Sequence, residues 1–179
     1  IPVEEKIIID ESFEIRDLIY SKKELKKYLV VVLSAKEVKI FLGNNTTFVR
    51  IVSNVPAHVS AYENDIAPAV ANYTDAASRR EVMLDKFMQH TDNGLSMLLH
   101  SYPFPVFIIG TEKTAGHFTA ITKNKKHIAG IIHGSHEDAT EAELRKLLEP
   151  AVADWKKLKH KQILEKIEDA MNAHKLAAG

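Results

Sequence analysis

Two apolar runs of strand length, separated by a short segment of helix or loop, constrain the fold of this chain more than any other feature. The first run, Val106 to Ile109, ends in Gly110, and the second, His127 to His133, ends in Gly134. Unbroken apolar runs of this length are typical of strands that are buried on both faces. Because a crossover joins the two runs, we expect neighbouring parallel strands at the centre of an α/β sheet.

Three further strands are predicted earlier in the chain. The segment Tyr28 to Ser34 is rich in β-branched residues and is the clearest strand pattern in the sequence. Val38 to Leu42 and Phe48 to Val52 follow, and Gly43-Asn44-Asn45 supplies turn residues between them. Because the links between these three strands are short, we expect them to form an antiparallel meander.

Helices are predicted between and after these strands. One begins near Ser78 and is stopped by Pro103 and Pro105. Another begins at the Thr140-x-x-Glu143 capping box, which precedes three leucines expected to face the sheet: Leu144, Leu147 and Leu148. The order of elements predicts an α/β fold, namely a ribonuclease H-like mixed sheet of about five strands (three antiparallel, then two parallel) with helices packed on it.

The length of 179 residues favours one main domain with appendages. We expect an N-terminal segment with short helices at 1–27, the ribonuclease H-like domain at 28–150, and a C-terminal helix leading out of the domain at 151–179. The last helix carries a narrow apolar stripe at Leu164, Ile167 and Met171. That stripe packs either on its own domain, on another element or on a second copy of the chain, so a homo-oligomer through this helix is one prediction.

Composition excludes several classes of protein. Lys+Arg and Asp+Glu are both 24, which argues against a dedicated nucleic-acid binder but permits a local basic patch. Without cysteine, disulfides and thiolate chemistry are excluded. No apolar run approaches the ~20 residues of a membrane span, so we expect no membrane partner and a cytoplasmic location. The sequence does not begin with Met, which predicts a processed chain or a fragment of a longer one.

Three clusters of lysine are candidate phosphate-binding sites. The cluster that we take as the nucleic-acid-binding candidate precedes the last strand and consists of Lys123, Lys125, Lys126 and His127. The other two lie at Lys22, Lys23, Lys26 and Lys27, and at Lys156, Lys157, Lys159, His160 and Lys161. Aromatic residues are scarce beside these clusters in the sequence, which argues against stacking on single-stranded bases.

Metal and nuclease chemistry have few candidate ligands. His133 and His136, followed by two acidic residues, have the spacing of a divalent-metal site, but the intervening Gly134 predicts a flexible loop without a tightly bound ion. Glu37 and Glu112 are the only acids close to the strand ends where a two-metal nuclease would need them. The sequence contains no G-x-S-x-G, P-loop or G-x-G-x-x-G motif, so we expect no cofactor.

Three stretches of the chain resemble one protein family. They are FEIRDLI at 13–19, YLVVVLSAKEVKIFLGNNTTFVRIV at 28–52, and VFIIGTEKTAGHFTAIT with HIAGIIHGSHEDATEAELRKLL at 106–148. These stretches resemble bacterial relatives of the archaeo-eukaryotic peptide-chain release factors, over roughly residues 12–155. The resemblance implies the ribonuclease H-like middle domain of these factors, with the ribosome or tRNA as partner.

True release factors of this kind carry a Gly-Gly-Gln loop that promotes hydrolysis of peptidyl-tRNA. By the resemblance, this loop corresponds to Asn54–Ala77, a segment without hydrophobic period that we expect to be a mobile functional tip. This segment contains neither Gly nor Gln, so no catalytic residue is carried over. The leading hypothesis is a non-catalytic, translation-factor-like domain. The alternatives are a metal-assisted hydrolase at His133 and His136, and a protein-interaction module using the last helix.

Overall fold

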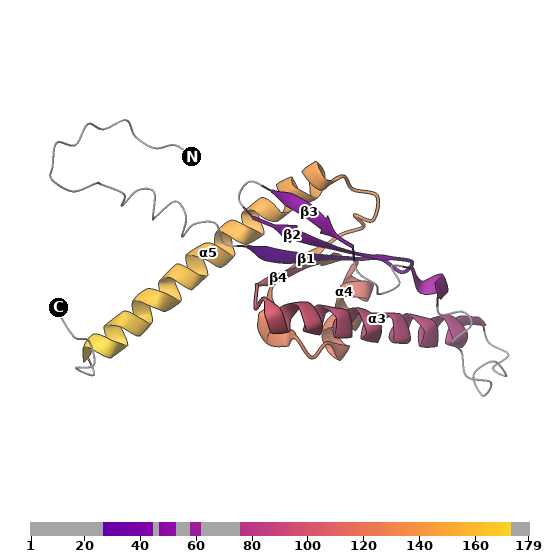
Figure 1. Cartoon of the computed structure of the whole chain (residues 1–179), viewed down its shortest axis with the longest axis horizontal. Helices are drawn as coiled ribbons and strands as arrows, with labels where there is room; N and C mark the ends of the chain where they lie inside the picture. The colour runs from indigo at the N-terminus through magenta and orange to yellow at the C-terminus, as the bar shows by residue number, and fades with distance from the viewer. Residues whose placement is uncertain (1–26, 45–46, 53–57, 62–75, 173–179) are drawn as a thin grey trace.

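The structure is a computed structural model that describes residues 27–44, 47–52, 58–61 and 76–172 (Figure 1). Its elements are β1 (Tyr28–Leu33), β2 (Val38–Gly43), β3 (Phe48–Ile51), α3 (Ala76–Ser101), β4 (Val106–Gly110), α4 (Glu112–Ile121), the 3-10 turn η2 (Lys125–His127), β5 (Ile128–His133) and α5 (Glu141–Asn172). The helices predicted before Lys27 lie outside the described residues. Within the described residues, no helix combines the length and the apolarity needed to cross a membrane.

The five strands form one mixed sheet in the order β3-β2-β1-β4-β5. β1 pairs antiparallel with β2, and β2 pairs antiparallel with β3. β4 lies parallel to β1, and β5 lies parallel to β4. The predicted ribonuclease H-like α/β sheet, with three antiparallel strands followed by two parallel ones, is therefore confirmed, and β1 occupies its centre.

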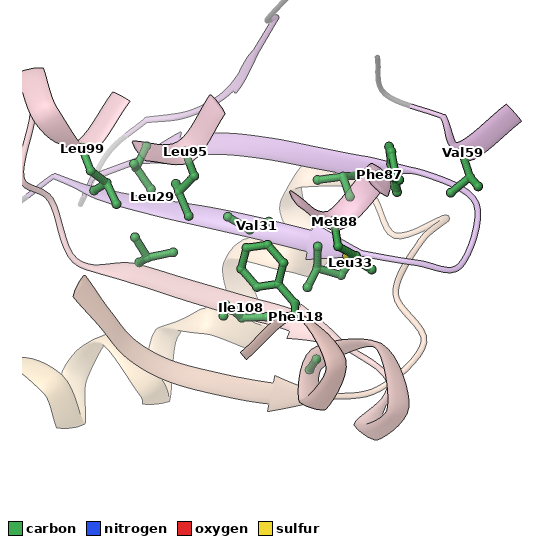
Figure 2. Close-up of a cluster of buried hydrophobic side chains, with 13 residues drawn as sticks. Leu29, Val31, Leu33, Val59, Phe87, Met88, Leu95, Leu99, Ile108 and Phe118 are labelled. Atoms are coloured by element: carbon green, nitrogen blue, oxygen red, sulfur yellow. The ribbon is translucent and has the colours of Figure 1, made fainter. Parts of the chain in front are cut away.

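Both faces of the central strands are covered, because successive side chains of a strand point to opposite faces. Leu29, Val31 and Leu33 pack on the face covered by α3 and α4, together with Phe87 and Phe118 (Figure 2). The alternate residues of β1 and β4 pack on the opposite face against Leu144, Leu148 and Val152 of α5. The leucines after the capping box therefore face the sheet, as predicted.

The prediction that both late strands are buried on both faces is wrong for β5. β4 is buried at every residue, from Val106 to Gly110, whereas Ile131 of β5 is 40% exposed. β5 is the last strand of the sheet, so one neighbour is missing and part of its surface faces solvent. An apolar run indicates a strand but does not tell whether that strand is central or at an edge.

α5 continues without interruption through Pro150, so the predicted boundary between 150 and 151 falls inside one helix. Its C-terminal half extends beyond the sheet (Figure 1). The apolar stripe lies on this half and is exposed: Leu164 by 48%, Ile167 by 43% and Met171 by 60%. Within the described residues the stripe is therefore not packed on its own domain. The homo-oligomer through this helix stays a prediction.

The capping box at the start of α5 is formed in both directions. The Thr140 backbone N–H and hydroxyl both donate to Glu143 Oε2 over 2.8 Å, and the Glu143 N–H donates to Thr140 Oγ1 over 3.3 Å. The two hydrogen bonds from Thr140 stabilise the charged carboxylate and lower the pKa of Glu143. The predicted start of this helix is confirmed.

This capping box predicts a measurable effect of pH. Because folding lowers the pKa of Glu143, its contribution to stability is present above the unfolded pKa and is lost as the pH falls through the lower, folded pKa. Thr140→Ala removes the hydroxyl donor, so we expect the pKa of Glu143 to rise in a side-chain NMR titration. Thr119→Ala on α4 is the control, and an equal rise in that variant would contradict the assignment.

Candidate nucleic-acid interface

The candidate phosphate-binding residues lie on the connection between α4 and β5, called here the basic loop (Lys123–His127). Lys123, Lys125 and Lys126 are exposed, and His127 is half-buried. The loop ends in the η2 turn, in which the His127 N–H donates to the Asn124 carbonyl over 2.9 Å. Among the described residues, no carboxylate forms an ion pair with these three lysines. The loop therefore presents three ammonium groups to solvent at a short turn.

A buried carboxylate of α3 holds this loop in place. Asp92 is only 3% exposed, and its two carboxylate oxygens accept hydrogen bonds from three consecutive residues of the loop and its approach. The Thr122 hydroxyl and the Asn124 amide donate to Oδ1, the latter over 2.8 Å. The Lys123 backbone N–H donates to Oδ2 over 3.0 Å. Each bond to a charged acceptor is stronger than a neutral one, so the carboxylate fixes the loop backbone.

Ser96 completes this arrangement, called here the Asp92 cluster (Asp92, Ser96, Thr122, Asn124). The Ser96 hydroxyl donates to the Asp92 carbonyl over 2.9 Å and accepts from Asn124 Nδ2 over 2.8 Å. No buried side-chain nitrogen or oxygen lacks a partner in the described part of the chain. A fully satisfied polar cluster of this kind rigidifies the segment that it joins, because each group would be costly to leave unpaired.

The sequence analysis did not identify the role of Asp92. The signal was its place on the apolar side of α3. Asp92 lies four residues after Met88 and three before Leu95, and both of these side chains are fully buried. An acid on a buried helix stripe requires hydrogen-bond partners, but the sequence does not identify them.

An exposed aromatic side chain lies at the same edge of the sheet as the basic loop. β1, β4 and β5 run parallel, so all three begin at one edge, called here the amino edge. Tyr102 lies just before β4, is 59% exposed, and stacks on Phe104 with ring centroids 5.7 Å apart. The chain therefore brings an exposed aromatic ring to the edge that carries the lysines. That the basic loop does not stack on single-stranded bases stays a prediction.

The other lysine clusters have different surroundings. The cluster at 156–161 lies where α5 leaves the sheet, and some of its side chains pair along the helix: Lys157 with Asp154 at 3.7 Å and Lys161 with Glu165 at 3.8 Å. These are exposed pairs of small energy. In the third cluster, Lys27 is exposed beside the start of β1, and its other lysines lie outside the described residues.

The histidine pair lies at the opposite edge of the sheet, where the parallel strands end. His133 closes β5, and the loop after it turns at Gly134, which has a φ of +155°. The ring of His136 lies over this glycine, because a Cβ at Gly134 would come within 2.9 Å of His136 Cδ2. The described residues contain no group of three or more metal-ligating side chains, so the structure adds no third ligand to His133 and His136. That His133 and His136 hold no tightly bound ion stays a prediction.

The two carboxylates considered for a nuclease have different surroundings. Glu37 pairs with Lys39 at 2.7 Å and lies 3.9 Å from His58. Glu112 is exposed in the first turn of α4, after the N-cap Thr111. The arrangement gives Glu37 a structural role, linking the β1–β2 turn to residue 58.

Part of the segment expected to be a mobile tip is docked on the domain. Of Asn54–Ala77, the structure describes 58–61 and the first residues of α3. His58 forms a β-bridge with Glu37, and the Val59 N–H donates to the Lys36 carbonyl over 2.8 Å. Val59 is 9% exposed and belongs to the core beneath α3 (Figure 2). The remainder of the predicted tip lies outside the described residues.

Comparison with known proteins gives one family match. A family model described as "Bacterial archaeo-eukaryotic release factor family 3" matches residues 27–179. No curated protein matches the sequence.

Two solved structures are similar in part. One is described as the Pelota protein of Thermoplasma acidophilum, with 16% identity, a TM-score of 0.37, and coverage of 88% of this chain and 48% of that one. Another, described as an archaeal protein, has 13% identity, a TM-score of 0.41, and coverage of 92% and 50%. The chain thus spans about half the length of each, and at these scores neither similarity supports a functional conclusion.

Proposed function

Since the chain belongs to bacterial archaeo-eukaryotic release factor family 3, we propose that it is a non-catalytic, translation-factor-like domain that associates with the ribosome or tRNA in the cytoplasm. The basic loop would make the contact with RNA phosphates. The observation that carries this proposal is the placement of three exposed lysines on a short turn fixed by the buried carboxylate of Asp92. The amino edge of the sheet would then face the RNA.

A fixed loop favours binding for two reasons. Cations that replace condensed counterions on RNA gain free energy from counterion release, whatever the base sequence. A loop that is already ordered loses less conformational entropy on binding than a flexible one. Because the whole chain has no net charge with neutral histidine, attraction to RNA must come from such a local cluster.

The absence of peptide-release activity is part of the proposal. The sequence has seven glycines and no two are adjacent, so it lacks the Gly-Gly-Gln signature that the family resemblance implies for a catalytic tip. Its two glutamines, Gln89 and Gln162, lie within α3 and α5. Neither is in the segment that corresponds to the tip. The proposed role is therefore to bind, and not to hydrolyse peptidyl-tRNA.

Ribosome binding by the full-length protein tests this proposal. We compare the natural protein with a variant in which Lys123, Lys125 and Lys126 are alanine, by cosedimentation over a series of salt concentrations. If each lysine contacts one phosphate, the slope of log K against log salt falls by about 0.7 per lysine, or about 2 in total. We expect binding of the variant to be at least about tenfold weaker at low salt.

The control variant carries the same charge change elsewhere: Lys36, Lys113 and Lys166 to alanine, all exposed and outside the basic loop. It is expected to keep the natural affinity and slope. Equal losses in the two variants would show that only total charge matters. A natural protein that binds neither ribosomes nor tRNA would refute the proposed function itself.

A further inference from the structure

A groove of ≈ 640 Å³ lies between α5 and the amino edge of the sheet. One wall is the surface of α5, and the other is formed by the start of β1 and the residue after β2. Its polar and charged lining residues are Tyr28, Asn44, Arg145, Lys146, Glu149 and Lys156. Three of these are cations and one is an anion, so the groove, called here the α5 groove, carries an excess of positive charge.

The cations line the groove because the buried side of α5 fixes the rotation of the helix. Leu144, Leu148 and Val152 pack on the sheet and recur at intervals of four residues. Arg145 and Lys156 are 11 residues apart in number, about three helical turns, so they lie along the same side of the helix, next to the buried one. They therefore line one wall of the groove along its length.

Tyr28 forms a rigid part of the opposite wall. It is 6% exposed, and its ring meets Phe107 edge to face at a centroid distance of 5.6 Å. Gly43 leaves room for the ring, since a Cβ there would lie 2.6 Å from Tyr28 Cζ and 2.9 Å from the hydroxyl oxygen. Burial raises the pKa of Tyr28, and the positive charge of Arg145 opposes this in part. The hydroxyl therefore remains protonated at neutral pH and can donate a hydrogen bond.

We propose that the α5 groove binds phosphate groups through Arg145, Lys146, Lys156 and the Tyr28 hydroxyl. A guanidinium, two ammonium groups and a phenol offer donors from both walls, and phosphate has oxygen acceptors to receive them. Arg145 and Lys156 are separated by about 16 Å along the helix axis, so each contacts a different phosphate group. The phosphate belongs either to an RNA backbone or to a free ion. The RNA source rests on the proposed function, whereas the free ion does not.

The position of the groove fits the RNA source. Tyr28 pairs with Gly43 at the amino edge, and β1 lies two strands from β5, where the basic loop ends. Neighbouring strands are about 4.8 Å apart, so the starts of β1 and β5 lie roughly 10 Å apart across the sheet. One RNA strand that follows the amino edge would meet the basic loop and then the α5 groove.

Titration of the full-length protein with inorganic phosphate and, separately, with a short oligouridine tests the groove. The test variant is Arg145→Ala with Lys156→Ala, and the control is Lys113→Ala with Lys166→Ala, two exposed helical lysines outside the groove and outside the lysine clusters. Alanine favours the helix, so both variants are expected to fold. We expect the test variant to bind at least one of the two probes about tenfold more weakly than the control, because it loses two charged contacts.

The two titrations, with inorganic phosphate and with oligouridine, distinguish the source of the phosphate. Loss of oligouridine binding alone identifies an RNA backbone site, and loss of inorganic phosphate binding identifies a site for the free ion. Unchanged affinity for both probes in the test variant, or no binding of either by the natural protein, overturns the inference. A protein that binds phosphate in the groove but binds neither ribosomes nor tRNA refutes the proposed function without contradicting the groove as a phosphate site. Tyr28→Phe is expected to weaken binding less than the double variant, because it removes one neutral donor.

Discussion

Asp92→Ala is expected to lower the free energy of unfolding by about 3 kcal/mol or more. The substitution leaves the Thr122 hydroxyl and the Lys123 N–H without the carboxylate acceptor. The Asn124 amide loses one of its acceptors and keeps the Ser96 hydroxyl and the backbone carbonyl of residue 92. A buried donor left without a partner costs about 1–3 kcal/mol, and water entering the site recovers part of the sum. Urea denaturation of the natural protein and the variant measures the loss, which is large against a typical stability of 5–15 kcal/mol.

Two further variants sharpen this test. Asp92→Asn keeps one oxygen acceptor but turns an amide toward the Lys123 N–H, so we expect a smaller loss of about 1–2 kcal/mol. Asp154→Ala removes an exposed acid on α5 and should change stability by less than about 0.5 kcal/mol. If Asp92→Ala is no more destabilising than Asp154→Ala, the Asp92 cluster does not hold the basic loop.

Phe107→Ala is expected to be equally severe, with a loss of about 3–5 kcal/mol, because it empties a fully buried site at the centre of the sheet. The ring of Phe107 packs edge to face against two other rings. Its centroid lies 5.6 Å from that of Tyr28 and 6.5 Å from that of Trp155. It therefore joins β1, β4 and α5 in one aromatic row. Loss of the ring should also loosen the contact that holds Trp155 of α5 against the sheet.

The sequence contains a single tryptophan, so fluorescence reports on Trp155 alone. We expect a red shift of its emission in folded Phe107→Ala, together with a lower midpoint in urea. Val49→Ala on β3 is the control, because Val49 is 58% exposed and lies away from this row. An unchanged emission maximum in Phe107→Ala would show that other contacts are sufficient to position α5.

The strands and the capping box could be predicted from the sequence because their signals are local. A buried strand such as Tyr28–Leu33 needs several consecutive apolar side chains, and a capping box needs two residues three apart, Thr140 and Glu143. Short links then favoured antiparallel neighbours, and crossovers favoured parallel ones. These rules predicted the meander and the parallel pair, but not that β4 lies beside β1 and that β5 is at the edge.

The features that concern binding depended on contacts between residues far apart in the chain. The Asp92 carboxylate accepts hydrogen bonds from Thr122 and Asn124, which lie 30 and 32 residues later in the sequence. The exposure of β5 could not be predicted from the sequence either, because an apolar run of this length occurs both in central strands and in edge strands. Local periodicity carries no information about which distant segment will supply a hydrogen-bond partner or cover a surface.

The sequence by itself thus determined the class of fold, the strand positions, the helix start at Thr140 and the resemblance to release factors. Only the tertiary structure placed the basic loop on a buried carboxylate, brought Tyr102 to the same edge, and opened a cationic groove between α5 and Tyr28. The physical reason is the distance along the sequence over which the interactions act. Backbone conformation and hydrophobic period are set by neighbours within a few residues, whereas a binding surface is assembled from segments that meet only when the core packs.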